Sequence, residues 1–311
     1  MTNRIISKVD YMDEDVAYFI GLLTAKGKLI EEKDNRRIII DFPYRNLFTR
    51  APEESGIKYS VPDKIKIGLF DIQKNLHELL GEEVSMEETE GSISFIVKFS
   101  RNTMVWRNIT TIMQDKINFY EFELNPIFYE MPESIQKCFM QGFADASSMP
   151  SEKDQDQFKR NRIVLQIPHD NWKLPVQICK LLQIHLKIPV CHIMYGHPSL
   201  KRDFREHRMR IFPEDFIKIG YGFSFKQDIL KAFINPKKNI KRDPSSLCNP
   251  KAKRIPKKKD KDPKEKDEKL PEHVRRHFNA YWQICMACGC KQGKKKPQLD
   301  LSFIAGDEID E

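Results

Sequence analysis

The sequence contains no long hydrophobic run. Nowhere among the 311 residues do about 20 consecutive apolar side chains occur, which is the length that a membrane-spanning helix requires. The N-terminus, MTNRIISKVDYMDED, runs into acidic residues where a secretory signal peptide would have its apolar segment. We therefore expect no membrane partner, and a protein that is cytoplasmic (nucleoid-associated) or nuclear, not secreted.

Cysteine is also scarce, with seven residues in the chain, too few for a disulfide framework at this length. Cys285, Cys288 and Cys290 lie close together, and Cys248 is available as a fourth thiolate for a tetrahedral zinc site. The spacing lacks a second C-x2-C pair, and two of these residues fall on the apolar stripe of a short helical pattern. Zinc binding and simple burial of the thiols both stay open.

Several signatures of catalysis are missing. The sequence has no phosphate-binding glycine loop, no nucleophile elbow and no H-E-x-x-H helix. This excludes the common NTPase, α/β-hydrolase and zinc-protease classes.

The net charge of +8 is unevenly distributed. Residues 1–236 carry 33 Lys and Arg against 33 Asp and Glu, residues 237–296 carry 20 against 7, and residues 297–311 carry none against 5. The excess positive charge therefore belongs to a basic tail segment, and the body is neutral. Residues 237–271 are rich in lysine and proline and read as a flexible basic linker. Residues 272–311 read as a short helix with the cysteine cluster and an acidic end, a candidate site for a protein partner.

The body contains an internal repeat. The apolar helical patterns EDVAYFIGLLTAKGKL (14–29) and PESIQKCFMQGFADASS (132–148) are each followed by a strand, at 36–43 and 161–168. An amphipathic helix that ends in a turn and a further strand follows in each half (71–84 and 176–190), then another alternating strand (92–99 and 207–212) and a closing helix. About 19 extra residues in the first half fall in 45–64, which has the composition of a loop. We expect an α+β protein of two αββαββα repeats, residues 1–130 and 131–236.

Small residues lie four apart within the two helical patterns: Gly21 and Ala25 in the first, Gly142 and Ala146 in the second. Residues four apart share one face of a helix, and small side chains there let two helix backbones approach closely. We expect the two halves to meet along these faces. The alternative is that the small residues only fit beneath a sheet.

The segments FIGLLTAKG (19–27) and FMQGFADASS (139–148) resemble the paired motifs of the LAGLIDADG homing endonuclease family in its single-chain, two-repeat form. The likeness extends over roughly residues 13–234, since RMRIFPEDFIKIGYGFSFKQDIL (208–230) is similar to the family's closing strand and helix. The resemblance implies two pseudo-symmetric repeats with antiparallel sheets. It also implies that the last acid of each motif would hold the divalent metal, Mg²⁺ in an active enzyme, that activates water for DNA cleavage.

Those two acid positions are occupied by Lys26 and Ser147. Neither side chain replaces a carboxylate, and an ammonium group repels a cation. Asp145 is the acid left in the second motif, but two residues along a helix turn it by about 200°, away from the face of Gly142 and Ala146. Asp145 is thus a weak catalytic candidate, and a cap or polar contact at the helix end is the alternative. Glu31, Glu32 and Asp41 are the acids available for a non-standard site.

The resemblance further implies that the sheet of each half lies in the major groove of DNA. The matching basic residues are Arg36, Arg37, Lys98, Lys159, Arg160, Arg162, Arg208 and Arg210. Arginine can bind guanine or a phosphate through two parallel hydrogen bonds. The alternative is a solvated sheet face with local ion pairs.

These features favour a protein that binds nucleic acid, double-stranded DNA first and RNA second, on a LAGLIDADG-like scaffold that does not cleave. The basic linker could add phosphate contacts that do not depend on sequence. Two alternatives stay open: an active site-specific endonuclease that uses other metal-binding acids, and a structural or interaction subunit of a larger complex.

Overall fold

The computed structural model describes residues 12–32, 35–47, 61–99, 102–151, 161–171, 173–194 and 206–234. The linker 237–271, the segment 272–311 with Cys248 and the other three tail cysteines, and Lys159 and Arg160 lie outside these residues. No helix in the described ranges is both long enough and apolar enough to span a membrane.

The first half follows the order expected from the sequence. Its elements are α2 (Glu14–Lys26), β1 (Gly27–Glu32), β2 (Asn35–Pro43), α3 (Tyr44–Leu47), α4 (Val61–Leu80), β3 (Val84–Glu88), β4 (Ser92–Phe99) and α5 (Met104–Ile112). All strand pairs are antiparallel, in the order β1-β2-β4-β3.

The second half repeats this order. A short 3-10 turn, η2 (Pro126–Tyr129), leads into it, and its elements are α6 (Glu133–Ser147), β5 (Ser148–Ser151), β6 (Arg162–Ile167), α7 (Lys173–Lys180), η3 (Leu181–His185), β7 (Val190–Met194), β8 (His207–Ile211), α8 (Pro213–Phe216) and α9 (Ser224–Phe233). Its sheet has the equivalent order β5-β6-β8-β7, again antiparallel. The α+β class with two αββαββα repeats is confirmed.

Local sequence explains the boundaries of the first repeat helix. The Asp13 carboxylate accepts a hydrogen bond from the Val16 amide at 2.8 Å and caps the start of α2. Gly27 follows the helix in an extended conformation, and glycine is needed there because a Cβ atom would lie 2.5 Å from the Leu23 carbonyl oxygen. The chain then enters β1 directly. Two strands therefore follow the helix, whereas the sequence pattern predicted a residue range for only the second of them, 36–43.

Helix α4 corrects the expected loop at 45–64. It begins at Val61, ten residues before the start at 71 expected from the sequence. Buried side chains follow it at helical spacing: Ile65, Leu69, Ile72, Leu76 and Leu80. Charged residues in the first turns of α4 had hidden this apolar stripe in the sequence. The side chains of the stripe pack into the core.

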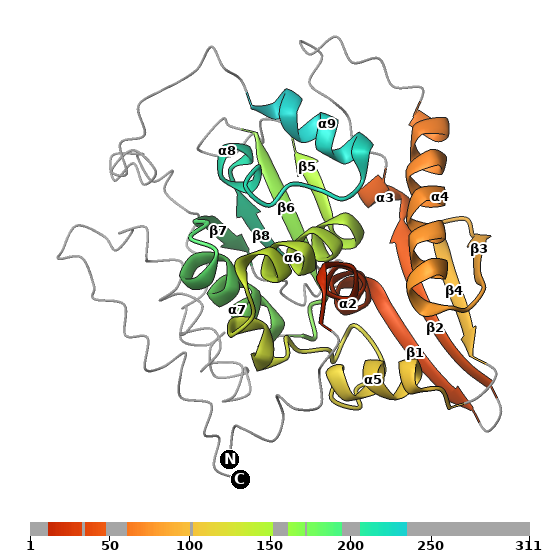
Figure 1. The fold of residues 1–311 in the computed structure, drawn as a ribbon. Coiled ribbons are helices and arrows are strands. Elements are labelled where there is room, and N and C mark those ends of the chain that lie inside the picture. The colour runs from red at the N-terminus through yellow and green to blue at the C-terminus, as the bar shows by residue number, and fades with distance from the viewer. Residues whose placement is uncertain are drawn as a thin grey trace, which may run out of the picture.

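The two halves meet at the helix pair α2 and α6, which lie side by side between the two sheets (Figure 1). One continuous core runs through both halves and includes Phe19, Leu22, Phe139 and Phe143, each at most 1% exposed. The repeats are therefore packed as one body through their first helices.

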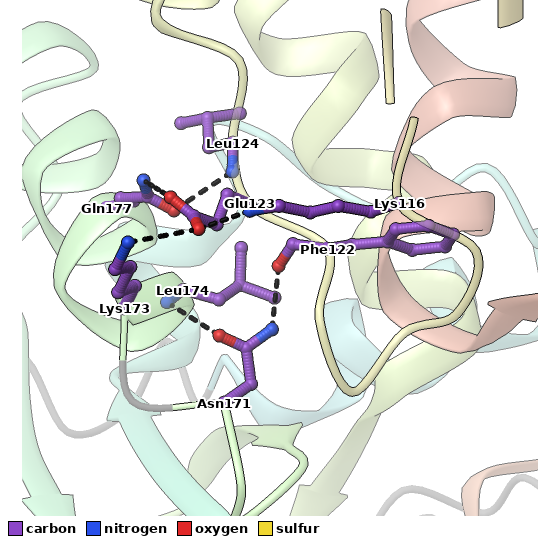
Figure 2. Close-up of polar contacts among 8 residues, drawn as sticks. All are labelled: Lys116, Phe122, Glu123, Leu124, Asn171, Lys173, Leu174 and Gln177. Atoms are coloured by element: carbon purple, nitrogen blue, oxygen red, sulfur yellow. Dashed lines mark hydrogen bonds and ion pairs between the residues drawn. The ribbon is translucent and has the colours of Figure 1, made fainter. Parts of the chain in front are cut away.

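The segment that joins the halves is fastened to α7 of the second half, as Figure 2 shows. The Asn171 side chain donates to the Phe122 carbonyl oxygen at 2.6 Å and accepts from the Leu174 amide at 3.1 Å. The Leu124 amide in turn donates to the Gln177 side-chain oxygen at 2.9 Å. Backbone groups of the connecting segment thus find their partners in the second repeat.

Glu123, in the same segment, binds two lysines. Lys116 donates to its Oε1 atom, and the Lys173 ammonium lies 3.3 Å from that atom. Burial raises the pKa of Glu123, but the hydrogen bonds and charges of these lysines outweigh it and hold the pKa below its usual value. The carboxylate therefore stays ionised and ties the connection to α7 (Figure 2).

Candidate nucleic-acid interface and the base of the helix pair

Gly21 and Gly142 allow the closest approach of α2 to α6. A Cβ atom on Gly21 would lie 2.1 Å from the Phe139 carbonyl oxygen, and one on Gly142 would lie 2.0 Å from the Tyr18 carbonyl oxygen. Ala25 and Ala146, one turn later, are also buried. Gly21 and Gly142 thus lie between the two helices, where backbone meets backbone, and Ala25 and Ala146 share their helix faces.

The last residues of the two helices are Lys26 and Ser147. Ser147 is fully buried and its hydroxyl donates to the Phe143 carbonyl oxygen of its own helix at 2.6 Å. The Lys26 ammonium lies 3.4 Å from Oε1 of Glu206, which comes from the other half, and Arg45 donates to the same oxygen. Burial lowers the pKa of Lys26, and the charge of Glu206 opposes this effect.

A divalent metal does not fit these residues. Hard cations need several oxygen ligands, and here one position is an ammonium group and the other a hydroxyl already hydrogen-bonded to its own helix. In the described part of the chain, no group of three or more His, Cys, Asp or Glu side chains is arranged to hold a metal ion. Positions 26 and 147 therefore supply no carboxylate to a metal ion.

The acids considered for a non-standard site do not converge. Glu31 receives a hydrogen bond from Arg36 at 2.8 Å, and Asp41 receives one from Ser94 at 2.5 Å. Glu32 lies 3.9 Å from Arg37. The Glu31 side chain points to the same face of the sheet as the buried Leu29. Glu32 and Asp41 point to the opposite face.

Asp145 is fully buried and binds the start of α9. Its Oδ2 atom accepts hydrogen bonds from the Tyr18 hydroxyl at 2.8 Å and from the amides of Gly222 and Phe223 at 2.9 and 3.1 Å. Burial raises the pKa of Asp145 to about 6, against the lowering effects of Lys226 and these hydrogen bonds. Asp145 thus makes polar contacts with the backbone that directly precedes α9, a helix whose N-cap residue, Phe223, has no side-chain cap hydrogen bond.

Lys226 completes the arrangement from the opposite direction. Its ammonium group is fully buried and donates to the carbonyl oxygens of Asp145 at 2.6 Å and Ser148 at 3.0 Å, at the end of α6. Burial lowers its pKa to about 8, although Asp145 acts in the opposite sense. Sequence reasoning missed this residue, yet a signal exists: Lys226 interrupts the apolar stripe of α9, three residues before the buried Ile229.

The face of the first sheet that points away from the helices has mixed charge. The alternation places Ile38, Ile40 and Phe42 in the core and their neighbours on this outer face. Strand register adds the matching residues of the other strands. The charged side chains of the outer face are Lys28, Arg37 and Lys98, with Glu32, Asp41 and Glu87.

Arg36 and Arg37, expected to act together, lie on opposite faces. The Arg36 side chain points to the same face of the sheet as the buried Ile38. It forms an ion pair with Glu31 on this face, which is the helix side. Arg37 pairs in register with the exposed Lys98 on the outer face. Arg36 therefore lies on the helix side of the sheet and Arg37 on the outer face, because adjacent strand residues point in opposite directions.

Among the described residues, the charged side chains on the outer face of the second sheet are arginines. Arg162, Arg208 and Arg210 lie there, and the described residues of that face include no Asp or Glu. Arg208 is exposed, whereas Arg162 is 2% and Arg210 5% exposed. Gln166, which sequence reasoning missed, pairs in register with Arg208. Its Oε1 atom is buried and has no hydrogen-bond partner in the described structure.

No protein-family model matches the sequence. No curated protein matches it either. The structure is similar to full-length DUF199/WhiA from Thermatoga maritima, with a TM-score of 0.43 and 13% identity over 76% of this chain. The chain spans 65% of the length of that protein.

Two further solved structures show comparable likeness. The N-terminal LAGLIDADG domain of DUF199/WhiA gives a TM-score of 0.37 at 13% identity, covering 75% of this chain and 88% of that domain. The homing endonuclease I-DmoI in complex with DNA and Mn gives 0.35 at 12% identity, covering 67% and 94%. The chain has a two-repeat, LAGLIDADG-like α+β fold, which its own element order and strand register establish.

Proposed function

We propose that this protein binds double-stranded DNA on the outer faces of its two sheets and does not cleave it at the base of the helix pair. The observation that carries the proposal is the exposed Arg208 on the second outer face, where strand register also places the mostly buried Arg162 and Arg210. On the first sheet, Lys28, Arg37 and Lys98 are basic residues of the outer face, where they lie among the acids Glu32, Asp41 and Glu87.

Strand geometry supports this use of the arginines. Arg208 and Arg210 are two residues apart on β8, so both lie on one face at a separation of about 7 Å. Side chains on alternate positions of a twisted strand can follow the edge of a groove, and arginine forms paired hydrogen bonds with guanine or phosphate. Arg208, the exposed one, is the residue expected to contribute most in the arrangement described.

Arg36 and Arg37 allow a matched test of the interface, because the two residues are adjacent and differ in the face they occupy. We expect Arg37→Ala to weaken binding of the full chain to a selected duplex and to reduce the salt dependence of the affinity by about one phosphate contact. Arg36→Ala should leave both unchanged, because Arg36 pairs with Glu31 on the helix side. Arg208→Ala should behave like Arg37→Ala. Fluorescence anisotropy over a series of salt concentrations measures these effects.

The duplex for that test comes from selection of random double-stranded DNA by the full chain. Enrichment of a motif supports reading by the sheets. Binding without enrichment, unaffected by Arg37→Ala and Arg208→Ala, contradicts it. If the protein prefers RNA to DNA in direct competition, RNA is the ligand. If it binds neither nucleic acid, the result favours a structural subunit of a larger complex.

Cleavage has a separate expected result. Incubated with a random-sequence plasmid library and Mg²⁺ or Mn²⁺, the full chain should produce no discrete cuts, because Lys26 and Ser147 supply no metal-binding carboxylate. Sequencing of linear products is the measurement. Reproducible cuts at one sequence would show that the protein is an active endonuclease with a different metal site.

A further inference from the structure

The base of the helix pair holds an ion pair that joins the two halves. Lys26 is the last residue of α2 in the first half, and Glu206 directly precedes β8 in the second. Their side chains are 5% and 15% exposed, and Nζ lies 3.4 Å from Oε1. The pair is thus removed from water and crosses the boundary between the repeats.

We infer that the Lys26 ammonium acts as a built-in cation, which takes the place of a bound metal ion at the base of the helix pair and holds Glu206 of the second half against the first. A carboxylate with little exposure requires a nearby positive charge, since an unpaired buried charge is strongly destabilising. Lys26 supplies that charge through a covalent tether, so it cannot dissociate as an ion does.

The surroundings of Lys26 support this role. Glu206 and Asp41 are the acids whose charges act on its ammonium group, and Arg45 is the opposing cation. The Phe119 ring lies 5.2 Å from Nζ and adds a favourable cation–π contact on the same side chain. One ammonium group therefore receives two negative charges and a ring face.

Arg45 is not an equivalent partner. It donates to the same Glu206 oxygen, but its side chain is 56% exposed. Ion pairs in contact with water contribute little to stability. Loss of Lys26 should therefore not be compensated by Arg45, and Glu206 would be left without a buried cation.

Two substitutions of Lys26 whose side chains have the same shape, Lys26→Gln and Lys26→Glu, test the inference. Thermal unfolding of the full chain is measured in EDTA, in Mg²⁺, and in NaCl of matched ionic strength, without nucleic acid, so that the result is independent of DNA binding. The wild-type midpoint should not respond to Mg²⁺ beyond the NaCl control. Lys26→Gln, which removes the charge, should lower the midpoint by about 5–10 °C in all three solutions.

Lys26→Glu has the shape of the glutamine variant but adds a carboxylate opposite Glu206. It should be less stable than Lys26→Gln in EDTA, and Mg²⁺ should restore it at least to the level of Lys26→Gln, because two carboxylates can share a divalent cation. Lys98→Glu, on the exposed outer face, is the matched control and should show no specific response to Mg²⁺.

Three results would overturn the inference: wild-type stability equal to that of Lys26→Gln, specific stabilisation of the wild type by Mg²⁺, or no rescue of a folded Lys26→Glu. If Lys26→Glu does not fold, the double-mutant cycle of Lys26→Gln and Glu206→Gln decides. The inference requires a favourable coupling between the two sites. Additive effects contradict it.

Discussion

Gly142→Ala should destabilise the protein by about 3–5 kcal/mol, the range of severe overpacking. The added methyl carbon would lie 2.0 Å from the Tyr18 carbonyl oxygen and 3.1 Å from the Leu22 amide nitrogen. Both atoms belong to the backbone of α2, so the clash is relieved only by moving the two helices apart. Because side chains of both helices belong to the one core of the two halves, we expect the whole protein to lose stability.

The measurement is the urea midpoint of the full chain. Gly91→Ala is the matched control, because a Cβ atom there meets nothing within 4 Å. Its free energy of unfolding should stay within about 0.5 kcal/mol of the wild-type value. Gly21→Ala should resemble Gly142→Ala, with its Cβ atom 2.1 Å from the Phe139 carbonyl oxygen. A Gly142→Ala variant as stable as Gly91→Ala would show that the helices do not pack this closely.

Asp145→Ala is the second substitution with a large expected effect, again about 3–5 kcal/mol. It leaves the Tyr18 hydroxyl and the amides of Gly222 and Phe223 without their acceptor. It also removes the negative charge nearest to the buried ammonium of Lys226. Asp145→Asn should cost less, since an amide oxygen can still accept these hydrogen bonds, and the urea midpoints of the two variants measure the difference.

The same pair of variants predicts a pH dependence. Burial raises the pKa of Asp145 to about 6, so in the folded protein the carboxyl keeps its proton at pH values where the unfolded chain has lost it. The contribution of Asp145 to the free energy of unfolding therefore increases as the pH falls from about 7 to about 4. The facing groups Lys226, Tyr18 and Tyr221 have pKa values above this window.

Urea unfolding of the wild type and Asp145→Asn across this pH range isolates the effect, because acids elsewhere in the chain contribute equally to both. The wild type should gain stability relative to the variant as the pH falls. A constant difference would contradict a raised pKa for Asp145. On the alkaline side Lys226 acts in the opposite direction: its lowered pKa makes its contribution increase as the pH rises from about 8 to about 10.5.

Periodic features of the chain were the ones that the sequence could predict. The duplicated order of helices and strands depends on apolar residues that recur every two or every three to four positions, and each half shows this pattern locally. The small residues Gly21, Ala25, Gly142 and Ala146 were identifiable for the same reason. The early start of α4 was missed because its first turns mix charged residues into the apolar stripe.

By itself, the sequence determined the two-repeat architecture, the helix faces and the absence of carboxylates at positions 26 and 147, because each depends on residue type and local spacing. Only the tertiary structure decided what those positions do instead. Lys26 meets Glu206, 180 residues away, and Asp145 meets Gly222 and Phe223 across the second half. Such long-range pairs leave no periodic trace, and the face that each strand arginine occupies follows from which of its neighbours the core buries.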